Sequence, residues 1–278
     1  MLVSGPAHDE IFAGNRSVGR IALSVAADGR GSRRKRVHEE GALRVRFPNV
    51  AAGSPLDAVI VNTAGGMTGG DHFTIEAAVG ADARLVVTTA AAEKIYRSLG
   101  PETRIDVKLE VGPGAQLAWL PQETIVFDRV RLRRSIDVAL SPGANLLLAE
   151  GIVFGRSAMG ETVRQGLLLD RWRVRSGGAL VFAESLRLDG AIAQSLARRA
   201  VAGESVAAAS VLKAPGDDNA VAAVRAMEKD FAGEVGISAW NGIAVARLVA
   251  RDGAALHRDL IAVLTALSEL PLPRLWLN

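Results

Sequence analysis

RIDVKLEVGPG, at residues 104–114, alternates apolar and charged side chains from Ile105 to Val111 and then turns at Gly112-Pro113-Gly114. A period of two places successive side chains on opposite faces of a β-strand, so the stretch predicts a strand with one buried and one exposed face. The same pattern recurs at residues 73–79 and 136–140. Successive half-buried strands that end in turns indicate a large antiparallel β architecture.

Other stretches predict strands that are covered on both faces. Residues 58–61 (AVIV) and 146–148 (LLL) are apolar at every position, which is typical of central strands. Asn241-Gly242 separates two apolar runs and predicts a hairpin. No internal sequence repeat is visible. We therefore expect one mainly β domain over residues 1–278, in which residues 1–14 are flexible.

Helical patterns are few and lie mostly toward the C-terminus. A short helix is predicted over residues 90–98, and Asn219 is expected to cap a helix that runs to about Phe231. Asp252 or Gly253 is expected to open a third helix, because apolar side chains from Leu256 to Leu267 recur at helical spacing. Two segments are predicted to be loops: 214–219, and the exposed, mobile segment 28–36.

The composition excludes several classes of protein. The chain has no cysteine, which rules out a disulfide framework, a cysteine zinc site and an iron–sulfur cluster. Hydrophobic residues make up 49% of the chain and charged residues 23%, which argues against disorder. The first residues lack the pattern of a signal peptide, and no apolar run is long enough to cross a membrane. We expect a cytoplasmic protein without a membrane anchor.

The charge is nearly balanced, at +3 from 33 basic and 30 acidic side chains. Two basic clusters stand out. The first consists of Arg30, Arg33, Arg34, Lys35 and Arg36, and the second of Arg129, Arg131, Arg133 and Arg134. The second cluster alternates with apolar residues, as one solvated face of a strand does. We interpret both clusters as solvated or partner-facing surface rather than as a phosphate-binding patch, and we expect no nucleic-acid partner.

Familiar catalytic motifs are missing from the sequence. There is no phosphate loop and no dinucleotide-binding glycine motif. Residues 38–42 (HEEGA) begin like a zinc protease helix but have Ala42 in place of the second histidine. Residues 155–159 (GRSAM) begin like a nucleophile elbow but have Met159 in place of the last glycine. These departures favour a protein without an active site of its own.

The stretch NTAGGMTGGD at residues 62–71 is unusually rich in glycine. Gly65, Gly66, Gly69 and Gly70 permit backbone conformations that other residues avoid, so the stretch is a structural connection or a place where another backbone approaches closely. Bare amide groups can also hold an anion, although Asp71 would repel one. We assign Gly65, Gly66, Gly69, Gly70 and Asp71 to a partner interface or a structural loop.

Several acidic residues stand in apolar surroundings. Glu123, Glu150 and Glu161 are the main ones, and Glu93 is a fourth. Burying a carboxylate is costly unless it is paired or bound to a metal. The structural alternative is a salt bridge to a nearby arginine such as Arg156 or Arg164.

Taken together, these stretches resemble the urease accessory protein UreD family, also called UreH. The matching segments cover most of the chain: residues 62–71, TTAAAEKIYRS at 88–98, LPQETIVFD at 120–128, EGIVFGRSAMGE at 150–161 and PRLW at 273–276. The resemblance implies a strand-rich body of β-helix-like layout with few helices. It also implies a non-catalytic protein that joins a helical accessory protein (UreF) and a GTPase (UreG), docks on apo-urease and assists GTP-dependent nickel insertion.

Residue chemistry adds a hypothesis about nickel. Nickel accepts imidazole and carboxylate ligands, and a route for an ion needs weak, replaceable ones. We therefore assign Glu123, Glu150 and Glu161 to nickel transit, with Asp71 and Glu93 as weaker candidates, and we expect no tightly bound cofactor. Two alternatives remain: a β-fold hydrolase, and a module that binds anions or nucleic acid through the arginine clusters.

Overall fold

The computed structural model describes residues 16–29, 31–51, 53–156 and 159–277. Its strands are β1 (Val18–Ala27), β2 (Ser32–Gly41), β3 (Leu43–Arg46), β4 (Leu56–Asn62), β5 (His72–Val79), β6 (Arg84–Thr89), β7 (Glu93–Ile95), β8 (Thr103–Val111), β9 (Gln116–Trp119), β10 (Thr124–Val126), β11 (Val130–Leu140), β12 (Asn145–Phe154), β13 (Gly166–Ser176), β14 (Ala179–Gly190), β15 (Ala207–Ala214), β16 (Glu234–Trp240) and β17 (Ile243–Ala250). The helices are α2 (Ile192–Leu196), α3 (Asp218–Arg225) and α4 (Gly253–Leu267), with 3-10 turns at Glu228–Asp230 and Arg274–Trp276. Residues 1–14, predicted to be flexible, and Arg30 of the first basic cluster lie outside the described residues.

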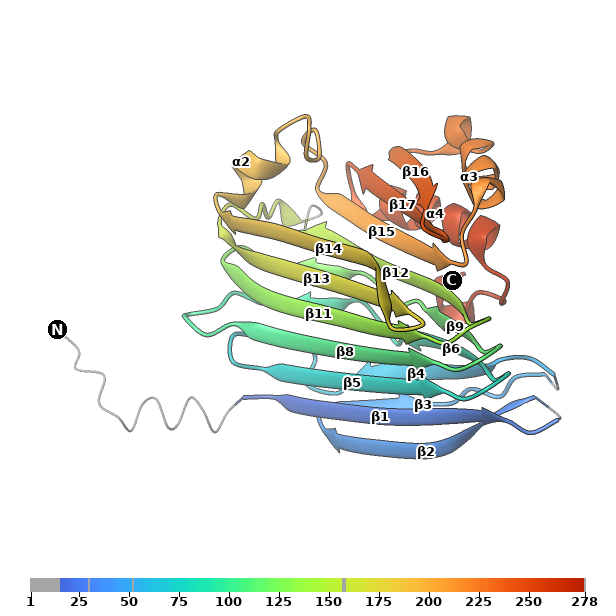
Figure 1. Cartoon of the computed structure of the whole chain (residues 1–278). Coiled ribbons are helices and arrows are strands. Elements are labelled where there is room, and N and C mark those ends of the chain that lie inside the picture. Colours follow the sequence, from blue (N-terminus) through green and yellow to red (C-terminus); the bar gives the residue numbers. More distant parts are fainter. Residues whose placement is uncertain (1–15, 30, 52, 157–158, 278) are drawn as a thin grey trace.

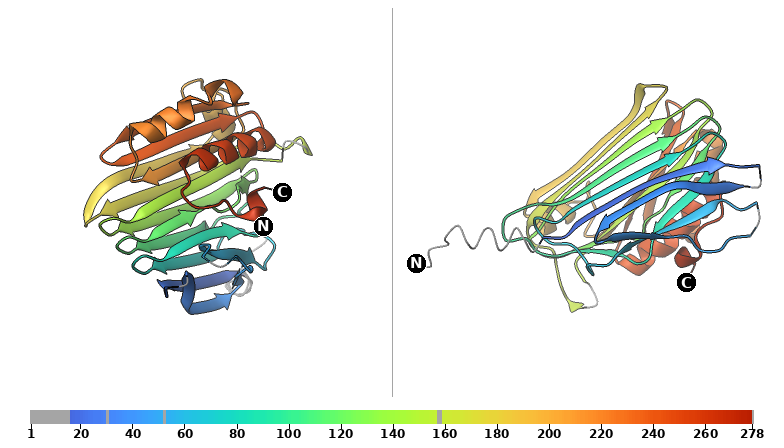
Figure 2. Two further views of the ribbon diagram at one scale, coloured as in Figure 1. Left: turned by 90° about the vertical axis from the view of Figure 1, so that its right-hand side faces the viewer. Right: turned by 90° about the horizontal axis from the view of Figure 1, so that it is seen from below.

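The strands form two facing sheets that the chain visits in turn (Figures 1 and 2). Sheet A has the order β14-β13-β11-β8-β5-β1-β2, and the main path of sheet B has the order β16-β17-β15-β12-β9-β6-β4-β3. The central strands of both sheets pair in parallel. This arrangement is a β-solenoid, which confirms the β-helix-like layout. The expectation of an antiparallel architecture is wrong for these central strands, because each crossover runs through the opposite sheet instead of through a hairpin.

The burial pattern differs between the two sheets because α3 and α4 pack on sheet B, whereas no helix of the described residues packs on the outer face of the central strands of sheet A. In β8, Ile105, Val107 and Leu109 point into the core between the sheets, whereas Asp106 and Lys108 face outward from sheet A. In sheet B, β12 is buried on both faces, because α4 packs on the outer face (Figure 2). The covered sheet therefore has continuous apolar runs in its sequence, and the uncovered sheet has alternating apolar and polar residues.

One corner of the solenoid repeats three times along the chain. The turns at 80–83, 112–115 and 141–144 each close with a backbone hydrogen bond of 3.1 Å between the fourth amide and the first carbonyl. The third residue of each turn has a positive φ, and the fourth is a buried alanine. The stacked corners are bonded to one another, since Gln116 N donates to Ala83 O and Asn145 N donates to Ala115 O. A structural repeat is therefore present where no sequence repeat is visible.

The C-terminal helices and the hairpin follow the sequence signals closely. Asp252 caps α4 by accepting from Ala255 N, and the stripe from Leu256 to Leu267 is buried. Asn241 and Gly242 both have positive φ and join β16 to β17, as predicted. Within the described residues, no helix has both the length and the apolar character of a membrane-spanning helix.

Three local predictions are wrong. Residues 90–98 form no helix, because the backbone of β7 is used in a parallel ladder with β10. Asp217, not Asn219, caps α3, and this helix ends at Arg225 rather than near Phe231. Residues 32–36 belong to β2 and pair with β1, so the segment 28–36 is only partly a loop.

Candidate functional site

Four of the five segments that carry the family resemblance meet at one edge of the solenoid. Met67 of the glycine stretch bridges to Ile95, Ile95 lies opposite Val126, and Val126 lies opposite Phe154. All four side chains are buried, so this column is a packed part of the core. We call the column the motif edge, and its segments are residues 62–71, 93–103, 124–130, 152–156 and 159–166.

The glycine stretch is held in place by Asp71. One carboxylate oxygen accepts from Thr68 N at 2.7 Å and the other from Ser17 N at 2.8 Å, and the side chain is buried. A β-carbon at Gly69 would lie 2.0 Å from Ser98 Oγ and 2.5 Å from the backbone carbonyl oxygen of Pro101, which is too close for any side chain. Close approach of the chain's own backbone therefore explains Gly69, and Asp71 is a structural residue of the loop.

The exposed surface of the motif edge is apolar and basic. Leu99 is 84% exposed and Met159 is 72% exposed, which is unusual for large apolar side chains. The exposed cations of the motif edge are Lys94, Arg97, Arg129, Arg156 and Arg164. Its acidic side chains are buried or half-buried; for example, Asp128 accepts from the amides of Arg164 and Gln165. An apolar surface with a basic rim fits an acidic protein partner.

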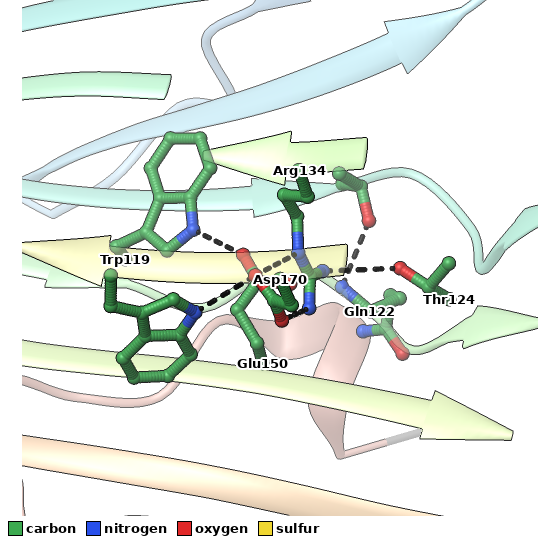
Figure 3. Close-up of polar contacts among 8 residues, drawn as sticks. Trp119, Gln122, Thr124, Arg134, Glu150 and Asp170 are labelled. Atoms are coloured by element: carbon green, nitrogen blue, oxygen red, sulfur yellow. Dashed lines mark hydrogen bonds and ion pairs between the residues drawn. The ribbon is translucent and has the colours of Figure 1, made fainter. Parts of the chain in front are cut away.

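A buried ion network lies between the two sheets (Figure 3). Arg134 of β11 forms ion pairs with Glu150 of β12 and Asp170 of β13, and all three side chains are at most 8% exposed. Trp119 Nε1 donates to Glu150 Oε1 at 2.9 Å, and Trp172 Nε1 donates to Asp170 Oδ1 at 3.1 Å. Two carboxylates thus share one guanidinium inside the core.

This sharing shifts the pKa values within the network. Burial raises the pKa of the Glu150 carboxyl above its ordinary value of 4.5, although Arg134 and Trp119 act in the opposite direction. Burial alone would lower the pKa of Arg134, but Asp170 and Glu150 outweigh it and hold that pKa above its ordinary value. Asp170 already neutralises the arginine through two contacts, so Glu150 carries the excess charge.

Glu123 lies on the other face of sheet B. Its Oε1 is 2.7 Å from His257 Nδ1 on α4, and the imidazole stacks on Trp276 with ring centres 5.1 Å apart. Trp276 Nε1 in turn donates to Leu120 O at 2.9 Å. The pair therefore fastens α4 and the C-terminal PRLW segment to the outer face of the sheet.

The three glutamates assigned to nickel transit are consequently kept apart. Glu161 pairs with Arg156 at 2.7 Å on the motif edge, Glu150 lies in the core, and Glu123 lies under α4. The suggested arginine partner is correct for Glu161, whereas Glu150 pairs with Arg134 and not with Arg156 or Arg164. In the part of the chain that the structure describes, no three Asp, Glu or His side chains group closely enough to hold a metal ion.

Sequence reasoning did not single out Asp170, Trp119, Trp172 or His257, and it placed Arg134 on a solvated face. Their positions in the core depend on which residues of each strand point inward. Along β11 the inward positions are Val130, Leu132, Arg134 and Ile136, so the arginine occupies a core position. Arg133, its neighbour, points to the exposed face and pairs with Glu102.

A serine, an aspartate and a histidine do meet on the outer face of sheet A. Asp106 receives a hydrogen bond from Ser135 Oγ at 2.6 Å and lies 2.8 Å from His72 Nε2. In a hydrolase triad the serine must instead contact the imidazole, which removes its proton. Here the aspartate lies between the other two, an arrangement that links three neighbouring strands.

Comparisons with known proteins give one consistent result. The family model described as UreD urease accessory protein matches residues 17–277. The urease accessory protein UreD of Rhodopseudomonas palustris strain HaA2 is 55% identical over 272 residues, which cover 98% of this chain and 97% of that protein. That of Bradyrhizobium diazoefficiens is 52% identical over 268 residues, 96% of each chain. The chain belongs to the UreD urease accessory protein family.

Proposed function

We propose that the chain is a non-catalytic scaffold in urease maturation. It joins a helical accessory protein of the UreF type and a GTPase of the UreG type in a cytoplasmic hetero-oligomer, docks on apo-urease and assists GTP-dependent nickel insertion. The family match across residues 17–277 carries this proposal. The curated relatives are named accessory proteins of urease, which supports a helper role rather than a catalytic one.

The motif edge supports the scaffold role. Its exposed Leu99, Met159 and Tyr96 stand among basic side chains, and exposed apolar surface of this kind marks protein interfaces. We propose that the glycine stretch at residues 62–71 contributes to this interface by keeping the edge thin and rigid. The basic rim suits an acidic surface on one of the partners.

A first prediction follows for solubility. Expressed alone, the chain should be poorly soluble, because its partner-facing apolar side chains remain exposed to water. Co-expression with the helical accessory protein should bring it into the soluble fraction as a complex. Size-exclusion chromatography with static light scattering checks this expectation. A monodisperse monomer that ignores the accessory protein would contradict the scaffold proposal.

We further propose that nickel passes through the interior beside Glu150. This carboxyl group lines a cavity of about 340 Å³ between the sheets and has a raised pKa. A proton competes with a metal for such a group, so binding is weak and replaceable. Glu161 on the motif edge and Glu123 under α4 are assigned to the surface portions of the route.

The second prediction concerns Glu150→Gln. Glutamine keeps the acceptor for Trp119 and leaves Arg134 paired with Asp170, so the fold and the accessory complex should persist. Urease matured with this variant should contain less nickel, because an amide is a weaker metal ligand than a carboxylate. Nickel content, complex yield and thermal stability are to be measured on the same preparation.

The pH dependence of stability tests the charge of Glu150 separately from its proposed part in nickel transit. A raised folded-state pKa means that the stability contributed by this carboxyl is fully present below about pH 4.5 and is lost as pH rises through the folded value. Glu150→Gln should therefore gain stability relative to wild type as pH rises. Full nickel loading by stable variants at Glu123, Glu150 and Glu161 would rule out the carboxylate route and leave the scaffold role intact.

A further inference from the structure

The last coil of the solenoid, formed by β13 to β17, leaves a mostly apolar cavity open at the C-terminal end of the stack. In a solenoid each rung covers the previous one, and a terminal rung needs a cover of its own. Here β14 is the edge of sheet A and β16 is the edge of sheet B, and α2 stands between the sheets near this end (Figure 1). The cavity of about 340 Å³ lies between β13 and β14 on one side and β15 and β17 on the other.

The walls of this cavity are mostly apolar. The walls include Leu188, Leu196 and Leu248, and the floor is formed by the ion network of Arg134, Glu150 and Asp170. At the mouth, Leu186 is 36% exposed and Val201 is 46% exposed. A recess of this size with an apolar lining is the kind that receives an anchoring side chain at a protein interface.

The loop beside the mouth carries a positive charge. Arg198 and Arg199 are exposed in this loop, between α2 and β15 and directly before the lining residues 200–202, and neither forms an ion pair with any residue in the described part of the chain. Glu204 is the one acidic side chain of that loop. Arg247, which lines the cavity, is already paired with Glu184 at 3.1 Å. Two arginines without an ion pair against one glutamate leave this loop positive, so an acidic partner is favoured.

The edge strand itself is protected against strand addition. β14 carries exposed charges at Arg187 and Asp189, and its register with β13 shifts at Val174/Arg175. Charged side chains and bulges are devices that keep edge strands from pairing with other chains. The recess, and not the backbone edge, is therefore the feature that offers binding energy.

We propose that the mouth of this recess, at Leu186 and Val201, and not its floor beside Glu150, is the socket for an apolar anchor residue on an acidic amphipathic helix of a partner. Such a helix places its apolar side chains on one face, with charged residues beside them to meet Arg198 and Arg199. Taking the helical accessory protein as the source of this helix rests on the proposed function.

The test is a competition for limited accessory protein. Wild-type chain and a variant, each with its own tag, are co-expressed with the accessory protein, and the ratio of the two in the purified complex is measured by mass spectrometry. The variants are Val201→Asp and the pair Arg198→Glu with Arg199→Glu. The matched controls on β2, at the far edge of sheet A, are Val37→Asp and the pair Lys35→Glu with Arg36→Glu.

Val201→Asp should be depleted about 30-fold, the effect of losing an anchor contact, and the arginine pair about 10-fold, with the latter loss shrinking at high salt. The β2 controls should share the partner equally with wild type. Equal sharing by the Val201 and arginine variants would overturn the socket while the scaffold role stands. Failure of wild type to bind the accessory protein would overturn both proposals.

Discussion

Arg134→Met should lower the free energy of unfolding by about 3–5 kcal/mol, because it leaves two buried carboxylates without their shared cation. Glu150 and Asp170 are 5% and 8% exposed at their side chains, so the little water that reaches them does not replace the guanidinium. The indoles of Trp119 and Trp172 would still donate, but neutral donors do not compensate a buried charge. Hydrogen exchange of β11, β12 and β13 in the co-expressed complex measures the loss.

Arg133→Met is the matched control, since it removes the same side chain from the next position of the same strand. Arg133 is 48% exposed and pairs with Glu102 at 2.7 Å, and exposed ion pairs contribute about 1 kcal/mol or less. Adding Glu150→Leu and Asp170→Asn to Arg134→Met should recover much of the lost stability, because no buried charge then remains. Equal effects of the Arg133 and Arg134 changes would contradict the buried network.

Gly69→Val should disrupt the motif edge and with it the accessory complex. The new β-carbon would lie 2.0 Å from Ser98 Oγ and 2.5 Å from the Pro101 carbonyl oxygen, and backbone cannot move aside cheaply. We expect a loss of about 3 kcal/mol, at the upper end of the usual cost of overpacking. Thermal unfolding and the yield of the accessory complex are the two measurements.

Gly65→Ala is the control for this change. Gly65 has a φ of 76° and nothing within 4 Å of its β-carbon position, so alanine should cost about 1–2 kcal/mol from backbone strain alone. The complex should therefore survive Gly65→Ala and fail with Gly69→Val. If the Gly69 variant keeps both stability and complex, the glycine stretch is a passive connector.

The mainly β class was readable from the strand pattern, but the direction of the strands was not, and the β-helix-like layout came only from the family resemblance. Alternation in residues 105–111 predicts a half-exposed strand, and half-exposed sheets are usually antiparallel. A solenoid breaks that association, because its crossovers pass through a second sheet that covers only one face of the first. The three stacked corners share one geometry, in which a residue with positive φ is followed by a buried alanine. The residue with positive φ is Asp82 in one corner and glycine in the other two, so the shared geometry leaves no visible sequence repeat.

The ion network was within reach of the same reasoning. Arg134 and Asp170 occupy inward positions of alternating strands, so the period that predicts those strands also buries their charges, whereas Glu150 lies in β12, where residues 146–152 are all buried. Their mutual pairing depends on how the sheets face each other, which no local pattern specifies. For the same reason the sequence could not pair Glu123 with His257, since 134 residues separate them.

The central claim is that this chain is needed to load urease with nickel, and the direct test is the nickel content of urease. Urease is purified from cells that express its structural proteins and all other accessory proteins of the same system, with or without this chain. The account predicts that the metal content and activity of urease are high with the chain present and low without it. Equal nickel content in the two preparations would contradict it.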